Sequence, residues 1–251
     1  MAGPWSDGQC GAVSLTFDDG LASQLFRAVP TLGRHGLRGT FYLNARSARW
    51  EEGLAPWADV AGLGHELGNH TLTHPCSGNF DFVPAGRGLE DLTLEDIAQD
   101  IDSCEERIRS VAGPGPRSFA YPCYQDFVGR GARRQSYVPL VAERFVAARA
   151  RGERANDPAR ADLHWLWSFP CERMDAAQMI GLCETATARG LWCILTLHGI
   201  HEGGLAVAAE DLEVLCAHLA AQRTRIWTAP VAEVAGHVLA WRGRQAADGR
   251  R

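Results

Sequence analysis

Short apolar segments alternate with amphipathic helical segments seven times along the 251 residues of the chain. Strict alternation of this kind predicts a parallel sheet, because each pair of parallel strands needs a crossover that a helix usually provides. Seven such units without an internal linker favour a distorted, seven-stranded relative of the (β/α) barrel. An open doubly wound sheet is the alternative, but no glycine-rich phosphate turn follows the first strand. We expect one domain over residues 1–241 and a disordered tail over residues 242–251.

The expected elements leave one long loop, residues 76–91, punctuated by glycine and proline. Thr93 begins a helix, with Asp96 three residues later completing a partial capping box. Strands are expected over residues 13–17, 38–44, 118–121, 163–169, 191–197 and 225–228, and over a short segment that ends near Asn69. Helices are expected over residues 21–35, 55–63, 93–111, 137–149, 175–189, 209–222 and 230–241.

Composition excludes several classes of protein. A hydrophobic fraction of 46% is enough for a packed core. The net charge of −5 argues against nucleic acid or an anionic membrane surface as a partner. No stretch approaches 18 consecutive apolar residues, so we expect no membrane span. The oligomeric state stays open.

The N-terminus and the cysteines together predict a cytoplasmic protein. Residues 1–7 show no basic start followed by an apolar run, so we expect no secretory signal. The eight cysteines are scattered, and no pair has zinc-knuckle or redox spacing. Reduced, mostly buried thiols are therefore expected.

Two histidines, His70 and His74, stand four residues apart within residues 64–75. If the chain turns helically after Asn69, this spacing places both imidazoles on one face. Histidine is the commonest ligand of transition metals, and two converging imidazoles can bind a divalent ion. The pair alone is weak evidence, and a third ligand elsewhere in the chain is needed.

Polar residues follow several of the expected strands at the point where each strand ends. Asp18 and Asp19 follow the first strand, the histidine pair follows the third, and His198 follows the sixth. In a parallel barrel the carboxyl ends of the strands form one rim, where the active site lies. A single Asp at a strand end is often a helix cap, but several such residues on one rim predict a cluster of two carboxylates and three histidines.

This cluster contains the groups needed to hydrolyse an amide or an ester. A carboxylate and two imidazoles make a metal site with open positions for water and substrate. A metal there lowers the pKa of water to about 7 and polarises a carbonyl. The second carboxylate can accept a proton from water, and the third histidine can protonate the leaving group.

Three segments resemble motifs of the polysaccharide deacetylases, the NodB-homology domain of carbohydrate esterase family four. They are Thr-Phe-Asp-Asp-Gly at residues 16–20, His-Thr-Leu-Thr-His at residues 70–74, and Leu-His at residues 197–198. Their order and spacing agree with the family, and the resemblance covers roughly residues 12–230. It implies a distorted (β/α) barrel with seven or eight strands.

The resemblance also implies a role for each matching residue. Asp18 would be the general base and His198 the general acid. Leu197 would line the pocket for the acetyl methyl, and Thr71 would hold its loop by hydrogen bonds. The implied ligands of one divalent ion, usually zinc but in some members cobalt, nickel or manganese, are Asp19, His70 and His74.

The third family motif departs from its usual form, Arg-x-Pro-Tyr. Ala120 stands where the arginine that pairs with the base is expected. The backbone N–H of Cys123, after Tyr121 and Pro122, can still donate to an oxyanion. Without that arginine the pKa of the base is expected to lie higher, unless Arg160 or Arg173 reaches in. The fourth motif, of the Asp-x-x-Asp-Trp type, is not recognisable, and its nearest candidates are Asp157, Asp162, Trp165 and Trp167.

The leading hypothesis is a metal-dependent deacetylase that acts on an N-acetylated sugar, an oligosaccharide or a glycosylated metabolite. Because we expect no secretory signal, a soluble sugar or a lipid-linked precursor is favoured over a cell-wall polymer. A non-sugar amide, a cyclic amide or an ester is the alternative substrate, and the altered third motif supports it. A third hypothesis is a binding protein that has lost catalysis, against which the joint presence of the five polar residues speaks.

Three further residues near these motifs have two interpretations each. Cys76 could ligate the metal, but a packed thiol is the favoured interpretation. His201 and Glu202 lie in a glycine-rich loop after His198. They could touch substrate or belong to a solvated loop.

Overall fold

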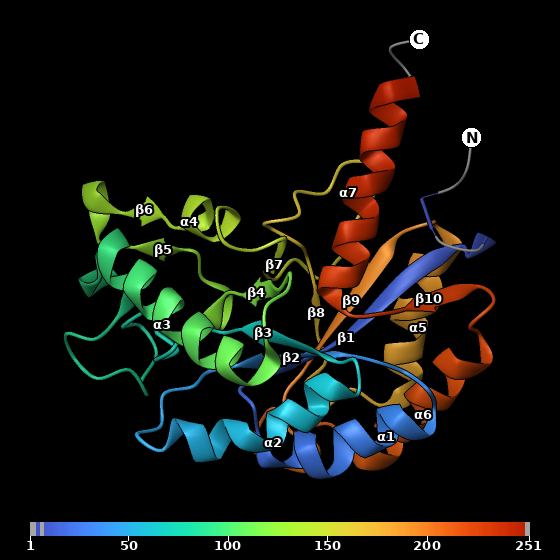
Figure 1. The fold of residues 1–251 in the computed structure, drawn as a ribbon, viewed down its shortest axis with the longest axis horizontal. Helices are drawn as coiled ribbons and strands as arrows, with labels where there is room; N and C mark the ends of the chain where they lie inside the picture. The colour runs from blue at the N-terminus through green and yellow to red at the C-terminus, as the bar shows by residue number, and fades with distance from the viewer. Residues whose placement is uncertain (1–3, 6–7, 249–251) are drawn as a thin grey trace.

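The structure of the chain is a computed structural model that describes residues 4–5 and 8–248. Its main element is one sheet in which every strand pair is parallel (Figure 1). Seven strands follow the order β7-β4-β3-β2-β1-β9-β8, and β10 adds an eighth by pairing with the first half of β1. The expected barrel-like α/β fold is therefore confirmed. The strands are β1 (Gly11–Asp18), β2 (Thr40–Leu43), β3 (Glu66–Asn69), β4 (Ser118–Ala120), β7 (Ala147–Arg149), β8 (Phe169–Pro170), β9 (Trp192–Leu197) and β10 (Ile226–Thr228).

Helices cover both faces of the sheet. Figure 1 shows α1, α2 and α6 on one side of it and α7 on the other. Thr93 caps α3 with Asp96 as its capping-box partner, as expected, and Asp175 caps α5 in the same way with Gln178. The helices are α1 (Val29–Arg34), α2 (Trp50–Gly62), α3 (Leu94–Ala112), α4 (Val138–Ala142), α5 (Ala176–Ala188), α6 (Ala209–Ala221) and α7 (Val231–Asp248).

The two faces of each strand have different surroundings. Val13, Leu15 and Phe17 of β1 belong to the largest hydrophobic core, which the sheet shares with the flanking helices. Their neighbours Thr16 and Asp18 are also buried but point to the opposite face, because successive side chains of a strand alternate. The inner face of the sheet is therefore partly polar, and its polar end is the end that carries the site.

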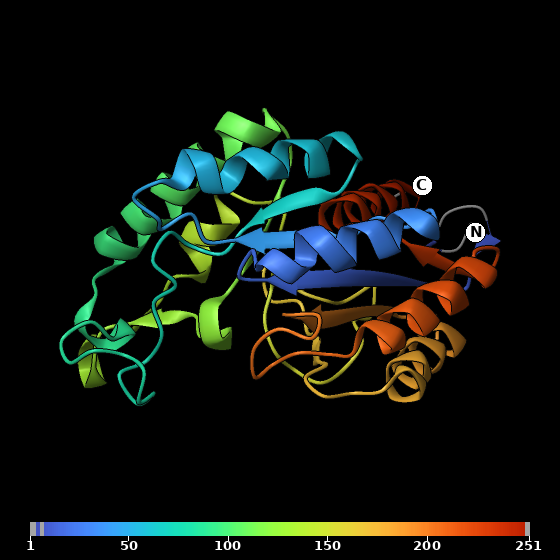
Figure 2. The same cartoon turned by 90° about the horizontal axis from the view of Figure 1, so that it is seen from below.

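The carboxyl ends of the strands lie at one side of the molecule. Figure 2 shows the arrowheads of the two blue strands, β1 and β2, pointing the same way, with residues 76–91 extending beyond them. The antiparallel pair β5 (Phe127–Val128) and β6 (Gln135–Ser136) also lies at this end. Among the residues that the structure describes, no helix combines the length and the apolarity needed to cross a membrane.

Two expectations for the middle of the chain are wrong. Residues 137–149 are not one helix, because α4 ends at Ala142 and Ala147–Arg149 form strand β7. The Ala148 N–H donates to the carbonyl oxygen of Leu163, and the Ala148 carbonyl oxygen accepts from the Leu166 N–H. Strand pairing therefore satisfies the buried backbone groups that a longer helix would otherwise have to satisfy. Of the strand expected over residues 163–169, only a bridge at Leu166 and β8 are present.

The expected disordered tail over residues 242–251 is also wrong for the part that the structure describes. Helix α7 continues to Asp248. The guanidinium group of Arg242 donates to the carbonyl oxygens of Pro158 and Ala161, each at 2.7 Å, and anchors this end of the helix. Residues 249–251 lie outside the described residues.

Candidate metal-binding active site

The three expected metal ligands lie together at the carboxyl ends of β1 and β3. Asp19 Oδ1 is 3.8 Å from His70 Nε2 and 3.5 Å from His74 Nε2, and all three atoms lie within 4.8 Å of one another. Two ligands of a tetrahedral zinc ion with bonds of about 2.1 Å are roughly 3.4 Å apart. The residues present therefore fit a divalent ion, with one carboxylate and two imidazoles on one side of it.

Neighbouring groups fix the orientation of these ligands. His70 Nδ1 lies 2.8 Å from the carbonyl oxygen of Ala120, an acceptor, so Nδ1 carries the proton and Nε2 keeps its lone pair for a metal. The side-chain amide of Asn44, just after β2, donates to Asp19 Oδ1 at 3.2 Å. Such outer contacts orient ligands and raise metal affinity.

His74 reaches the site through a tight turn rather than through the expected helical turn. Thr71 and His74 both have positive φ angles, of 61° and 55°. The Thr71 hydroxyl accepts a hydrogen bond from the His74 N–H at 3.1 Å. Asp100 of α3 accepts from the backbone N–H groups of Leu72 and Thr73, at 2.6 and 3.2 Å. A carboxylate from a distant helix therefore holds the turn, which spacing along the chain could not reveal.

The electrostatic surroundings favour neutral imidazole at His74. Burial, and then the neighbouring His70, lower the pKa of His74 to about 4. A neutral ring is the form that binds a metal ion.

Asp18 lies deeper than Asp19, and its side chain is 5% exposed. Its Oδ2 accepts a hydrogen bond from Arg149 Nη2 at 2.5 Å. The same oxygen lies 3.8 Å from His70 Nε2 and 3.9 Å from His198 Nε2. Burial alone would raise the pKa of Asp18, but the charge of Arg149, aided by both histidines, holds the pKa below its ordinary value. Oδ1 is buried and has no hydrogen-bond partner, so it is free to accept one.

His198 follows β9 and faces the same carboxylate. Gln24, in the π-helix Gln24–Ala28, donates its side-chain N–H groups to the backbone carbonyls of Asp18 and His198, at 2.5 and 3.1 Å. Gln24 therefore ties the ends of β1 and β9 together, a role that the sequence did not suggest. A π-helix near a site is itself a recurrent functional signal.

Among the described residues, no carboxylate accepts a hydrogen bond from His198 Nδ1. Its Nδ1 is buried without a hydrogen-bond partner. Asp157 and Asp162, the candidates from the unrecognised fourth motif, accept from the backbone N–H groups of Ala159 and His164 in their own loop. Trp167 lies in that loop too and is 39% exposed.

The arginine beside Asp18 is Arg149, which the sequence did not indicate. The hydrophobic pattern places it at the end of a helix, whereas it ends strand β7 with no solvent exposure. Arg160 does not reach in, since its side chain is 88% exposed beside Asp157. Arg173 is exposed, and its backbone N–H donates to the carbonyl oxygen of Ala206 at 3.2 Å. The expected rise in the pKa of Asp18 is therefore wrong, because burial would raise this pKa but the charge of Arg149 lowers it.

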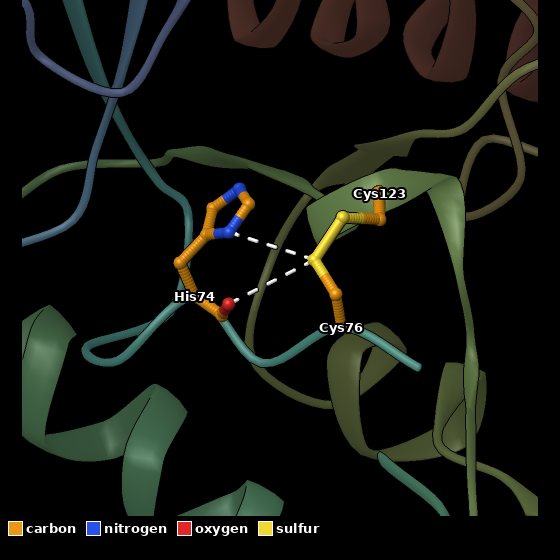
Figure 3. Close-up of side chains that lie close together, drawn as sticks. All are labelled: His74, Cys76 and Cys123. Carbon is orange, nitrogen blue, oxygen red and sulfur yellow. Dashed lines mark hydrogen bonds between the residues drawn. A yellow bond between two sulfur atoms is a disulfide. The ribbon is translucent and has the colours of Figure 1, made fainter. Parts of the chain in front are cut away.

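A disulfide links Cys76 to Cys123, with an S–S distance of 1.97 Å (Figure 3). The expectation that these two cysteines are free thiols is wrong, because a loop after β3 brings together residues 47 apart in the chain. Figure 3 shows the Cys76 sulfur beside His74, 3.6 Å from its Nδ1. The bond joins the loop of a metal ligand to the turn expected to form the oxyanion hole.

The remaining candidates divide between the rim and the core. Tyr121 is buried, and its hydroxyl donates to the carbonyl oxygen of His164 at 2.9 Å. Leu197 is buried in the core between the sheet and the helices, so its contact with an acetyl methyl stays a prediction. His201 pairs with Glu210 at 3.0 Å, and Glu202 accepts from the Ser23 N–H at 2.7 Å. These last contacts are structural.

Unusual backbone angles gather at the site. Eight non-glycine residues of the described chain have positive φ angles, and several of them carry or adjoin the groups described above. Such strain persists only where the surrounding structure enforces it, and it clusters at functional sites. The residues at the site are Asp19, Thr71, His74, Cys123 and Tyr124.

Comparison with known proteins gives a family match for the first half of the chain. Residues 6–127 match the family model for polysaccharide deacetylase. Over 120 residues the chain is 28% identical to the uncharacterized protein YlxY of Bacillus subtilis (strain 168), covering 48% of this chain and 31% of that protein. Over 129 residues it is 27% identical to a peptidoglycan-N-acetylglucosamine deacetylase of Bacillus cereus, covering 51% and 40%. The chain thus spans less than half the length of either relative.

Solved structures share the fold over nearly the whole chain. A "putative polysaccharide deacetylase" from Mycobacterium smegmatis has a TM-score of 0.68 at 19% identity, covering 96% of this chain and 94% of its own. A family 4 acetyl xylan esterase from Clostridium thermocellum, in complex with a cobalt ion, has a TM-score of 0.55 at 19% identity, covering 89% of each chain. At these identities the likeness establishes the fold alone.

Proposed function

The chain belongs to the polysaccharide deacetylase family, and on that premise we propose that it is a metal-dependent hydrolase that removes the acetyl group from an N-acetylated sugar. One observation carries the proposal: an unpartnered carboxylate oxygen of Asp18 lies within one site with a metal-compatible triad and a third histidine. A water held there would have both a base and an acid near it.

The roles of the residues follow from their contacts. Asp19, His70 and His74 would hold the ion, which supplies a water of lowered pKa and polarises the acetyl carbonyl. Asp18 would take the proton of the attacking water. His198 would donate a proton to the leaving nitrogen. The backbone N–H of Cys123 would stabilise the oxyanion.

Zinc is the metal we propose, because the donor set of one carboxylate and two imidazoles is typical of catalytic zinc. The acetyl xylan esterase with a similar fold binds cobalt, so cobalt is a useful spectroscopic substitute. Nickel and manganese are the other metals to test.

The substrate class rests on the relatives. The Bacillus cereus relative is a peptidoglycan-N-acetylglucosamine deacetylase, and an N-acetylated amino sugar is accordingly the first substrate to test. The second candidate is an acetyl ester, favoured by the fold shared with the acetyl xylan esterase. A catalytically silent binding protein is disfavoured, since base, acid and ligands converge on one point.

The test is release of acetate from a matched panel of N-acetylated and O-acetylated sugars. Metal-loaded protein should release acetate from N-acetylated members, lose this activity in a chelator and regain it with zinc. The Asp18→Asn variant is the control, because it should keep the metal but not the activity. Acetate release from the esters alone would replace the amide proposal with the ester one, and release from neither by metal-loaded protein would contradict both.

A further inference from the structure

We propose that a surface groove between residues 153–169 and helix α5 binds a chain of sugar units at a distance from the candidate metal site. The groove consists of two cavities, of about 320 and 420 Å³. The cavities adjoin, because Ala155, Asp157 and Trp167 line both of them. Two adjoining cavities fit an extended ligand. The inference deepens the proposed function and rests on it for the chemistry of that ligand.

The groove is separate from the candidate metal site. None of its lining residues belongs to the metal-compatible triad, and neither Asp18 nor His198 lines it. Leu191, which lines the larger cavity, precedes β9, whereas His198 follows β9. The six residues of β9 separate these two positions by roughly 20 Å at about 3.3 Å per residue. A ligand in the groove therefore makes a second contact with the protein, outside the catalytic cluster.

The sequence singled out residues of this groove that catalysis leaves without a role. The Asp and Trp candidates for the fourth motif all line the smaller cavity, and none of them contacts His198. They are Asp157, Asp162, Trp165 and Trp167. Binding of a sugar in the groove would account for this combination of carboxylates and indole rings.

Trp167 lies between the two cavities, and its position is fixed although its side chain is 39% exposed. The buried side chain of Asn156 donates to the Trp167 carbonyl oxygen at 2.8 Å and accepts from the Trp167 N–H at 2.9 Å. The indole packs directly on Gly152, where a Cβ would lie 2.2 Å from Trp167 Cγ. An exposed aromatic ring held in this way loses little conformational entropy when a ligand packs on it.

Each cavity also has a second aromatic ring in its wall. Trp165 lines the smaller cavity and lies against Tyr121, with ring centres 5.2 Å apart. Phe169 lines the larger cavity. Binding sites for small ligands are typically lined by aromatic side chains, with a few polar groups that fix the orientation of the ligand. The C–H groups on the face of a sugar ring can pack on such aromatic surfaces.

The charged residues of the groove balance one another. Three carboxylates and three guanidinium groups line it, so their formal charges cancel. They are Glu153, Asp157, Asp162, Arg154, Arg160 and Arg189. A surface without net charge does not attract a nucleic acid or an anionic membrane, whereas carboxylates accept and guanidinium groups donate hydrogen bonds to hydroxyl groups. The groove therefore fits a neutral ligand with many hydroxyl groups, and the proposed function makes an N-acetylated glycan the ligand of this class.

The experiment measures binding of a β-1,4-linked pentamer of N-acetylglucosamine by calorimetry. Asp18→Asn is the parent protein, because it should not turn the pentamer over. Trp167→Ala in this parent should weaken binding roughly tenfold or more, as loss of a central aromatic contact does. The matched control is Trp50→Ala, because Trp50 begins α2 and its ring is covered by Arg107 at 5.1 Å. The control should bind the pentamer as the parent does.

A second variant keeps the test valid if Trp167→Ala does not fold. Thr185 is exposed on α5 and lines the larger cavity. Thr185→Arg fills this cavity with a long side chain and removes no core contact, so it should also weaken pentamer binding. In the catalytically active protein, either variant should raise KM for the pentamer and leave kcat unchanged. Neither should change kcat/KM for N-acetylglucosamine, which is too short to reach both places.

Three results would overturn the inference. They are absence of pentamer binding to the parent at millimolar concentration, unchanged affinity in both groove variants, and a dimer in gel filtration that Thr185→Arg dissociates. The dimer would assign the groove to a second copy of the chain. Pentamer binding that depends on Trp167 without acetate release would keep the inference and contradict the proposed function. Acetate release from the pentamer that ignores both variants would keep the function and overturn the inference.

Discussion

The two halves of the site differ in how closely function is tied to the local sequence. The half on β1 and β3 holds the candidate metal ligands, and these residues stand in short contiguous motifs. The half on β4, β7 and β9 holds the groups around the proposed base and the proposed acid, and these come from separate strands. The family model matches residues 6–127, so it covers the first half and ends before Arg149 and His198.

The difference has a physical cause. A metal ion requires its ligand atoms within a few tenths of an ångström of set positions, so the backbone that presents them is tightly constrained. A charge that holds a carboxylate needs only a long side chain that reaches the right point. Any inward-facing position on a neighbouring strand can supply it, as the pairing of Ala120 with Arg149 shows.

The largest effect should come from the ligand half. The His70→Ala/His74→Ala double variant should lose its metal and its acetate-releasing activity together. The loss should well exceed the roughly 10–100-fold cost of changing an outer-shell group. Metal analysis after gel filtration measures the first effect. His201→Ala is the control, since that ring pairs with Glu210 instead. A double variant that retained one tightly bound ion would show that the ligands lie elsewhere.

The next effect separates the two adjacent carboxylates. Asp18→Asn should keep the ion and lose activity by on the order of a hundredfold or more. Asp19→Asn should weaken metal binding itself, so its activity should recover in part when excess zinc is supplied. The reverse pattern would exchange the two roles.

The pH dependence of the Asp18→Asn defect follows from the charges around Asp18. Burial would raise the pKa of this carboxyl, but Arg149 and the two histidines hold it below its ordinary value. A group with a lowered pKa is ionised at every pH well above that value, and so Asp18 is a competent base throughout the neutral range. The ratio of wild-type to Asp18→Asn activity should therefore be the same at pH 6 and pH 8. A ratio that grew with pH would mean that Asp18 titrates between them.

The sequence revealed the fold class because strand–helix alternation is a property of local hydrophobic pattern. It also predicted the candidate ligand set, because Asp18-Asp19 and His70 to His74 are local motifs. It could not reveal Arg149, since three buried residues of β7 have no pattern of their own and follow a short helix. Local pattern also could not predict the contacts of Asp100 and Gln24 or the Cys76–Cys123 bond. Each of these contacts joins residues that are separated in the chain or belong to different elements.

A smaller and more selective effect should come from His198. An amine leaves poorly unless it is protonated, whereas a nitrophenolate leaves without help. His198→Ala should therefore lower amide hydrolysis much more than hydrolysis of an activated acetyl ester. Parallel kcat/KM measurements on an N-acetylated sugar and 4-nitrophenyl acetate test this. Equal losses on both substrates would identify some other group as the acid.

The smallest effect on turnover should come from the disulfide. It joins the loop that carries His74 to the turn that carries Cys123, so its loss should loosen both and lower kcat a few-fold.

The effect of the disulfide on stability should be larger in proportion, because closing a loop of 47 residues is worth roughly 4 kcal/mol in the chain-entropy treatment of the unfolded state. The Cys76→Ser/Cys123→Ser variant should thus unfold at a lower temperature than the wild type. Dithiothreitol should reproduce that shift in the wild type and add nothing in the variant. Cys10→Ser, at an exposed free cysteine, is the control and should not shift the midpoint. If the wild type and the double variant unfold at the same temperature under oxidising conditions, the two loops are held by their hydrogen bonds alone. The half of the site on β4, β7 and β9 would then need the disulfide no more than the half on β1 and β3 does.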